Sequence, residues 1–226
     1  MKPLKNNLQR GKWVVGMFYA LIATLLLSLY FKGQQFQLFV AYKAGEVDDA
    51  LIQADAQREV VLRFAYLGLY IGTASCFLLW FRRAYHNLHG LVHRPAYKEA
   101  SATAAWFIPF VNLVRPYQIA LDLYTQTAAW LTERGQSSRL SHDVLGLWWT
   151  MWLLSAVMGQ WLLRQQTSGA SYDELLGNAR FALVVNMFDL LLCLVAVKMV
   201  NDYRRAERLL WTSAPKNNEE VMATGD

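Results

Sequence analysis

The sequence is poor in cysteine, and it lacks the short motifs that mark common catalytic and metal centres. Its two cysteines are too few for a disulfide framework, and no Cys-x-x-Cys pair or Cys/His spacing points to zinc. It contains no glycine-rich phosphate loop, no His-Glu-x-x-His pair and no Gly-x-Ser-x-Gly motif. These absences favour a protein that is not an enzyme, and they predict no bound cofactor.

Charged residues are almost missing from four stretches of the chain, Trp13–Phe31, Phe64–Phe81, Val144–Leu163 and Phe181–Val197. The chain has 22 Lys and Arg and 17 Asp and Glu residues, and of these only Asp189 lies in the four stretches. Each stretch is 17 to 20 residues long, and a helix needs about 20 apolar residues to cross a hydrocarbon core ~30 Å thick. The sequence therefore predicts an all-α, polytopic membrane protein with four transmembrane helices. We expect a single membrane domain over 1–212, with spans at about 13–31, 64–81, 144–163 and 181–200, and a disordered cytoplasmic tail over 213–226.

Lys and Arg are unevenly divided between the two sides that four spans create. The two termini and the connection 82–143 together hold 16 of them, and the other two connections hold 6. The positive-inside rule places the richer side in the cytoplasm, so both termini should be cytoplasmic. This topology and attraction to anionic lipid explain the net charge of +5. Membrane lipids are therefore expected partners, and nucleic acid is not.

A short apolar segment within 103–131 interrupts the long cytoplasmic connection. Thr103–Val114 is too short to span a bilayer and too apolar for a free loop, which predicts an interfacial or re-entrant position. Pro109 should break a helix there because it lacks a backbone donor, and Asn112 could satisfy the backbone groups that this frees. Pro116 suits the first turn of a new helix, which we expect to lie on the bilayer surface. The apolar stripe of that helix consists of Tyr117, Leu121, Tyr124, Ala128 and Leu131.

The same segment and the end of the second span carry a family resemblance. The residues concerned are Leu79-Trp80-Phe81-Arg82-Arg83-Ala84, Asn87-Leu88, Trp106-Phe107, Pro109, Asn112-Leu113 and Pro116-Tyr117-Gln118. With them the chain resembles the bacterial membrane proteins of domain-of-unknown-function family 4328, over about residues 63–208. The resemblance implies a small multi-span protein of the bacterial inner membrane without an assigned activity, and it transfers no catalytic residues. The functional candidates in and beside these motifs are Arg82, Arg83, Asn87, Trp106, Pro109, Asn112, Arg115, Pro116, Tyr117 and Gln118.

Asp189 stands out because it is the charged residue inside a predicted span. A carboxylate at mid-span costs ~2.5–3.5 kcal/mol on insertion scales, so it should face other helices and have a partner. Asn186, three residues earlier, shares its helix face and could bond a neutral Asp189 carboxyl, and Arg115 is an alternative partner if the re-entrant segment reaches it. Asp189 and Asn186 are thus candidates for an ion or proton site, or for a structural contact between helices.

His86, His89 and His93 form a second, weaker constellation. Their spacing of i, i+3 and i+7 would place three imidazoles on one face of a helix, where they could bind a metal ion. Gly90 and Pro95 disfavour a continuous helix there, and the stretch holds no Asp or Glu. The alternative is that these are juxtamembrane histidines at the headgroup boundary.

The third predicted span is rich in tryptophan and is preceded by Ser141-His142-Asp143. Consecutive residues cannot form a catalytic triad, so Ser141 or Asp143 is expected to cap the helix. The tryptophans should mark the ends of the span as interfacial anchors, although Trp149 and Trp152 could instead pack against a neighbouring helix. They are Trp148, Trp149, Trp152 and Trp161.

Three hypotheses for function follow from these features. The first is a non-enzymatic membrane module that binds lipids, a protein partner or a second copy of itself through the aromatic, basic and proline-broken segment. The second is a small oligomeric transporter or channel that uses Asp189. The third is an interfacial lipid-modifying enzyme, which only Asp122 and the histidines support.

Overall fold

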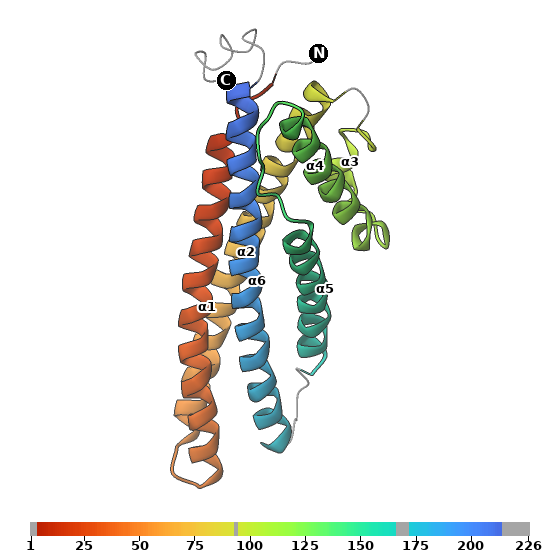
Figure 1. Ribbon diagram of the computed structural model, residues 1–226. Coiled ribbons are helices and arrows are strands. Elements are labelled where there is room, and N and C mark those ends of the chain that lie inside the picture. The colour runs from red at the N-terminus through yellow and green to blue at the C-terminus, as the bar shows by residue number, and fades with distance from the viewer. Residues whose placement is uncertain (1–3, 93–94, 166–171, 214–226) are drawn as a thin grey trace. The chain divides into compact units, whose positions relative to one another are not determined.

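The computed structural model describes residues 4–92, 95–165 and 172–213, and every regular element in them is helical (Figure 1). This confirms the all-α class. The long helices are α1 (Leu8–Lys43), α2 (Asp49–Leu91), α5 (His142–Arg164) and α6 (Tyr172–Ser213). The remaining elements are α3 (Ser101–Ala104), the 3-10 turn η1 (Val111–Leu113) and α4 (Arg115–Thr132). Of the tail predicted over 213–226, Ser213 ends α6 and the rest lies outside the described residues.

Three helices of the described residues are long and apolar enough to cross a membrane, namely α1, α2 and α6. At 1.5 Å per residue they are about 54 to 65 Å long, roughly twice the thickness of a hydrocarbon core. Their ends therefore extend beyond it. The apolar part of α6 ends near Val200 and is followed by Arg204, Arg205 and Arg208.

The helix α5 covers the third predicted span. Its four tryptophans carry a polar indole N–H, and Gln160 lies near its end. The serine cap predicted for this helix is present, since the Val144 backbone N–H donates to Ser141 Oγ at 3.3 Å.

Both α1 and α2 extend further than the predicted spans. α1 continues to Lys43, well past Phe31, and α2 runs from Asp49 through the second span without a break. Polar contacts join these extensions: Lys32 Nζ lies 2.9 Å from Glu59 Oε1. In addition, Gln35 Nε2 donates to the buried Asp55 carboxylate at 2.7 Å. These partners are 20 and 27 residues apart, so the helical propensity of one segment does not reveal them.

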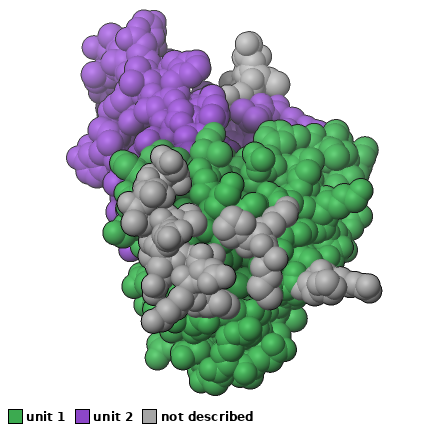
Figure 2. All heavy atoms as spheres, turned by 90° about the horizontal axis from the view of Figure 1, so that it is seen from above, with its two compact units in different colours: residues 1–17, 73–149, 195–226 green, residues 18–72, 150–194 purple. Residues whose placement is uncertain are grey.

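The chain divides into two compact units, which Figure 2 colours separately. Unit 1 comprises residues 1–17, 73–149 and 195–226, and unit 2 comprises 18–72 and 150–194. Unit 2 has a small core in which Leu21 and Leu25 of α1 pack with Cys193 of α6. Tyr66 and Leu69 of α2 and Leu190 are among the residues packed against it.

Unit 1 has a larger core, in which α4 contacts α2 and α6. The Tyr85 hydroxyl of α2 donates to Asp122 of α4 at 2.7 Å, and the Tyr124 hydroxyl of α4 donates to the Met199 carbonyl of α6 at 2.8 Å. Because α4 packs on two helices, the face that it buries in the protein differs from the predicted apolar stripe: Tyr124 and Leu131 are buried, whereas Tyr117, Leu121 and Ala128 are half-buried. The buried residues are Pro116, Ile119, Ala120, Leu123, Tyr124, Thr127, Trp130 and Leu131.

Candidate functional site

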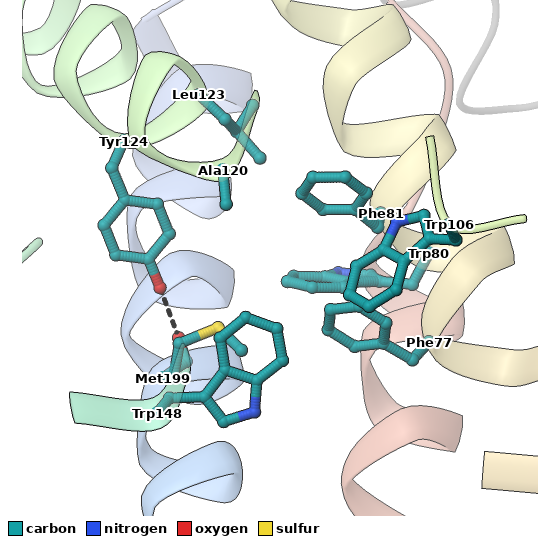
Figure 3. A pocket seen from close by; sticks show the side chains of 9 residues that line it. All are labelled: Phe77, Trp80, Phe81, Trp106, Ala120, Leu123, Tyr124, Trp148 and Met199. Carbon is teal, nitrogen blue, oxygen red and sulfur yellow. Dashed lines mark hydrogen bonds between the residues drawn. The ribbon is translucent and has the colours of Figure 1, made fainter. Parts of the chain in front are cut away.

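Aromatic side chains fill the centre of unit 1, around a cavity of ≈ 10 Å³ (Figure 3). The Phe77 ring stacks on Phe81 with centroids 5.8 Å apart, and it meets Trp106 edge to face at 5.7 Å. Trp148 lies 5.6 Å from Phe77 on another side. A space this small holds about one water molecule, so the cluster is packed core rather than a ligand pocket.

Two tryptophans that were predicted to anchor the third span at a membrane interface belong to this cluster. Trp148 and Trp149 are only 5% and 6% exposed. They face inward because Trp106, more than 40 residues earlier in the sequence, packs against both rings, with centroids 6.5 and 5.8 Å away. The anchor interpretation was therefore wrong for Trp148, and the packing alternative holds for Trp149. Trp161 is 44% exposed and meets Phe181 edge to face at 4.3 Å.

The loop between α3 and α4 is held at both ends by aromatic contacts. At its start, Trp106 packs in the aromatic cluster. At its end, the Trp149 indole N–H donates to the Leu113 carbonyl at 3.2 Å, and Tyr117 stacks on Trp149 with centroids 6.2 Å apart. The motif residues Trp106 and Tyr117 are thus anchors that fix this loop on the fold.

Between these anchors the loop turns large apolar side chains outward. Phe110 is 85% exposed and Phe107 is 71% exposed, although each carries a full aromatic ring. The apolar loop, as we call it, exposes Phe107, Ile108, Phe110, Leu113 and Val114. A contiguous exposed apolar patch of this kind marks a surface that meets a membrane or a partner.

The backbone of the apolar loop is folded by short-range hydrogen bonds around Pro109. The Val111 N–H donates to the Pro109 carbonyl at 2.8 Å, and the Asn112 N–H donates to the Ile108 carbonyl at 3.0 Å. The main chain thus satisfies the groups that the Asn112 side chain was expected to satisfy. Phe110 has a φ of 63°, which disfavours a residue with a side chain by about 1 kcal/mol or more. Pro116 lies in the first turn of α4, as predicted.

A groove of about 370 Å³ lies beside the apolar loop. We call it the Tyr97 groove. Its lining residues are Ala96, Tyr97, Lys98, Ser101, Ala104, Ala105, Ile108, Val111 and Arg115. The Arg115 guanidinium lies 5.1 Å from the centre of the Tyr97 ring, and the Tyr97 hydroxyl donates to Gln118 Oε1 at 3.3 Å. Arg115 and Gln118, both sequence candidates, therefore hold Tyr97 in place.

Asp122 joins this groove to the helices behind it. Its carboxylate accepts hydrogen bonds from the Tyr85 hydroxyl at 2.7 Å, from the Ala96 backbone N–H at 3.2 Å and from Gln126 at 2.6 Å. Burial and the hydrogen bond to Asp122 raise the pKa of Tyr85 above its ordinary value. The Tyr85 hydroxyl also accepts from the Tyr97 N–H at 3.1 Å. Asp122 therefore positions the wall of the groove.

A carboxyl group is buried where the N-terminal residues meet α2 and α6. Glu207 is 1% exposed, and Asn7 Nδ2 donates to its Oε1 at 3.0 Å and to the Trp80 carbonyl at 3.2 Å. Burial raises the pKa of Glu207 to about 7, against the hydrogen bond from Asn7 and the charge of Arg204, which lower it. This is the most deeply buried acidic side chain among the described residues.

Asn87 holds the N-terminal residues from the α2 side. Its side-chain oxygen accepts from the Lys5 backbone N–H, and its Nδ2 donates to the Lys5 carbonyl, each at 2.9 Å. Leu4 is 2% exposed beside them. The Asn87 side chain therefore binds both backbone groups of Lys5. The motif residue Asn87 has a structural partner that its position in the sequence did not suggest.

Arg82 and Arg83 lie on the same end of α2. Arg82 is exposed, whereas Arg83 is half-buried, and its pKa is lowered by burial and by the neighbouring charges of Arg10 and Arg82. Arg10 donates to the Leu79 carbonyl at 3.1 Å, which also fixes α1 on α2. These three arginines form a basic surface around the buried residues Glu207 and Asn7.

Asp189 and Asn186 have separate partners in unit 2. Asp189 Oδ1 accepts from the Ser155 hydroxyl of α5 at 2.5 Å. Asn186 Nδ2 donates to Ser28 Oγ of α1 at 3.0 Å. Neither of the two partners expected for Asp189 is the one observed: Asn186 bonds Ser28, and Arg115 lies over Tyr97.

The two described histidines of this set, His86 and His89, have separate contacts. His86 Nδ1 lies 2.8 Å from Glu99 Oε1, and the His89 ring packs edge to face on Tyr85 at 5.1 Å. His93 lies outside the described residues. Within the part of the chain that the structure describes, no three His, Cys, Asp or Glu side chains gather as a metal site would require.

Comparison with known protein families gives one match, over residues 43–205, to a family described as a domain of unknown function, DUF4328. The match covers well over half of the chain and includes the apolar loop, the Tyr97 groove and both candidate motifs. The chain belongs to this family. The resemblance expected over residues 63–208 is thereby confirmed. No curated protein and no solved structure matches the chain.

Sequence reasoning missed four residues that build these sites: Asn7, Tyr97, Lys98 and Glu207. Glu207 lies among arginines in the stretch Arg204-Arg205-Ala206-Glu207-Arg208, where a solvated surface is the ordinary interpretation. A clue was available in its spacing, since Tyr203, Ala206 and Leu210 around it make an apolar helical face. Tyr97 gave no such signal, because only the fold brings it to Arg115.

Proposed function

We propose that this protein is a non-enzymatic, four-span module of the bacterial inner membrane that binds lipid through its apolar loop. The observation that carries the proposal is the exposure of the loop, in which Phe107 and Phe110 are 71% and 85% exposed. Burial of a large apolar side chain stabilises by about 1.5–3 kcal/mol. Insertion of several such side chains into a leaflet is therefore favourable, and the contacts of Trp106 and Trp149 hold the loop ready for it.

The arrangement of unit 1 supports a fourth span in α5. Asn7 hydrogen bonds to Trp80 and Glu207 keep the start of α1, the end of α2 and the end of α6 together. If α6 crosses a membrane and ends on that side, it must begin on the other side. The chain must then cross between α4 and α6, where the structure describes α5. Its 23 residues give about 35 Å of helix, which is enough for a bilayer core.

The proposed orientation has both termini and the apolar loop in the cytoplasm, because 16 of 22 Lys and Arg residues would lie on that side. Reporter fusions at Gly45 and Gln136 test it. The fusion at Gly45 should report the periplasm and the fusion at Gln136 the cytoplasm. The reverse pattern at both positions would contradict the orientation.

Insertion of the loop is tested with a fluorescent label at a single cysteine. In a background with Cys76 and Cys193 replaced by Ala, the full chain carries Phe110→Cys labelled with an environment-sensitive dye, in liposomes. We expect quenching by doxyl lipids and protection from aqueous iodide. The matched control is Gln136→Cys, in an exposed turn, which should show the opposite behaviour. Equal iodide quenching at both positions would refute lipid insertion.

A second candidate function, an oligomeric transporter or channel, has one observation in its favour. Asp189 and Ser155 form a polar contact of 2.5 Å between two predicted spans, and Asn186 and Ser28 form a second polar contact between spans. Asp189→Asn keeps the shape and the hydrogen bond but removes the titratable proton. Loss of the cellular role at an unchanged amount of folded protein would favour this function over the lipid-binding module.

A further inference from the structure

The Tyr97 groove is lined by both basic and apolar side chains. Lys98 and Arg115 supply its charge, and Ser101 supplies a hydroxyl. Ile108 and Val111 supply apolar surface, and Ile108 belongs to the apolar loop as well. A groove that combines two cations with exposed apolar side chains is the complement of a lipid with an anionic headgroup.

The cations of the groove are not neutralised by carboxylates of the groove itself. Among its described lining residues there are two cations and no Asp or Glu. Glu99, next to Lys98 in sequence, lies 2.8 Å from His86, and Asp122 of α4 accepts three hydrogen bonds. Lys98 and Arg115 are both exposed, so both side chains are accessible to a ligand.

The groove is also preorganised. The Tyr97 ring is fixed by hydrogen bonds at its backbone N–H and at its hydroxyl, to Tyr85 and Gln118. The Arg115 guanidinium lies over this ring at 5.1 Å, which keeps the cation at the groove while its N–H groups remain able to donate. A fixed guanidinium loses less entropy when it binds a phosphate than a free one does.

We propose that the Tyr97 groove binds the phosphate of an anionic phospholipid, whose acyl chains lie along the apolar loop. Lys98 and Arg115 donate charge-assisted hydrogen bonds to the phosphate oxygens, and Ile108 and Val111 contact the chain nearest the glycerol. This inference rests on the proposed lipid-binding function and adds the headgroup chemistry. A soluble phosphorylated compound would use the two cations but would leave the apolar surface unoccupied, which is why we assign a lipid.

The test measures binding of phosphatidylglycerol and phosphatidylcholine to the purified full chain in detergent, by native mass spectrometry. The wild type should prefer phosphatidylglycerol. The double variant Lys98→Gln and Arg115→Gln should weaken phosphatidylglycerol binding about tenfold or more, equivalent to about 1.4 kcal/mol, and should leave phosphatidylcholine binding unchanged. The control, Lys12→Gln with Arg139→Gln, changes the net charge equally at two exposed positions outside the groove and should keep the preference.

Three outcomes overturn the inference. The first is equal loss of phosphatidylglycerol binding in the groove variant and the control, which would indicate a diffuse charge effect. The second is retention of full binding by the groove variant. The third is displacement of phosphatidylglycerol by millimolar inorganic phosphate, which would identify a soluble phosphate as the ligand.

The design separates this inference from the proposed function. The Phe110→Cys label reports insertion of the loop independently of the headgroup. If the label is buried in lipid and the groove variant still binds phosphatidylglycerol as the wild type does, the headgroup site is refuted and the module stands. If the label remains in water, the proposed function itself fails. Rescue of selectivity by Lys98→Arg, which keeps the charge, distinguishes a phosphate contact from damage to the fold.

Discussion

Replacement of Glu207 by Gln should stabilise the protein at alkaline pH. Glu207 is 1% exposed, and its pKa is raised by burial from 4.5 to about 7. Gln has nearly the same shape and can still accept the hydrogen bond from Asn7, but it carries no proton that the fold must retain. The substitution therefore removes the free-energy penalty for ionising a buried carboxyl group and leaves the contact.

The sign and size of the effect follow from the two pKa values. A carboxyl whose pKa is raised on folding favours the folded state fully below about pH 4.5, and this contribution is lost as pH rises through about 7. A pKa raised from 4.5 to about 7 corresponds to about 3 kcal/mol at pH 8.5 and to about 1 kcal/mol at pH 5.5. Relative to Glu207→Gln, the wild type should therefore lose about 2 kcal/mol between these two pH values.

Thermal unfolding of the purified protein in detergent measures this difference. For a chain of this size, about 2 kcal/mol corresponds to a change of roughly 4–8 °C in Tm. We expect the Tm advantage of Glu207→Gln to be that much larger at pH 8.5 than at pH 5.5. The control is Glu133→Gln, because Glu133 has a largely exposed side chain at the end of α4. A pH dependence of Tm that is the same in wild type and Glu207→Gln would refute the reasoning.

Three further predictions concern the contacts around the two sites. Asn87→Ala removes both hydrogen bonds to the Lys5 backbone, so amide exchange at Lys5 should accelerate while exchange in the middle of α1 stays slow. Trp106→Ala leaves a cavity in the aromatic cluster and should destabilise the protein by about 3–5 kcal/mol. A Tm equal to that of the wild type would contradict the anchoring role of Trp106. Asp189→Leu leaves Ser155 without this partner and should lower the stability of the protein in detergent by about 1–2 kcal/mol. Stability and activity equal to those of the wild type would contradict both the structural and the functional role suggested for Asp189.

Much of the fold could be predicted from the scarcity of charge. A helix of about 20 uncharged residues leaves few alternatives to a membrane span, and Asp49–Leu91 continues through its predicted span as expected. Proline was equally informative, because Pro116 can enter a helix only near its first turn. The extension of α1 to Lys43 could not be predicted in the same way, since it is stabilised by side chains of α2, such as Glu59, that are distant in sequence.

The faces of helices were harder to predict than their positions. For α4, an apolar stripe could be drawn through Tyr117 or through Ile119, because both lie at helical spacing with several apolar neighbours. The choice depends on what packs against the helix, and α4 packs on α2 and α6, not only on a bilayer. Trp148 shows the same limit. A tryptophan near the end of a span suits the headgroup region, but here Trp106 provides a buried partner from another segment.

The contrast between Asp189 and Glu207 shows why sequence context is a poor guide to which charged side chains are buried. In the sequence, Asp189 is a candidate for a buried charge because its neighbours are apolar, whereas Glu207 is not a candidate because its neighbours are arginines. In the fold, Asp189 is half-buried with one hydroxyl partner, whereas Glu207 is 1% exposed with Asn7 donating to it. Desolvation depends on the atoms that surround a carboxyl group in space, and those come from segments up to 200 residues away. Arg205 and Arg208, next to Glu207 in sequence, are exposed, whereas Glu207 turns inward and holds the N-terminal residues through Asn7.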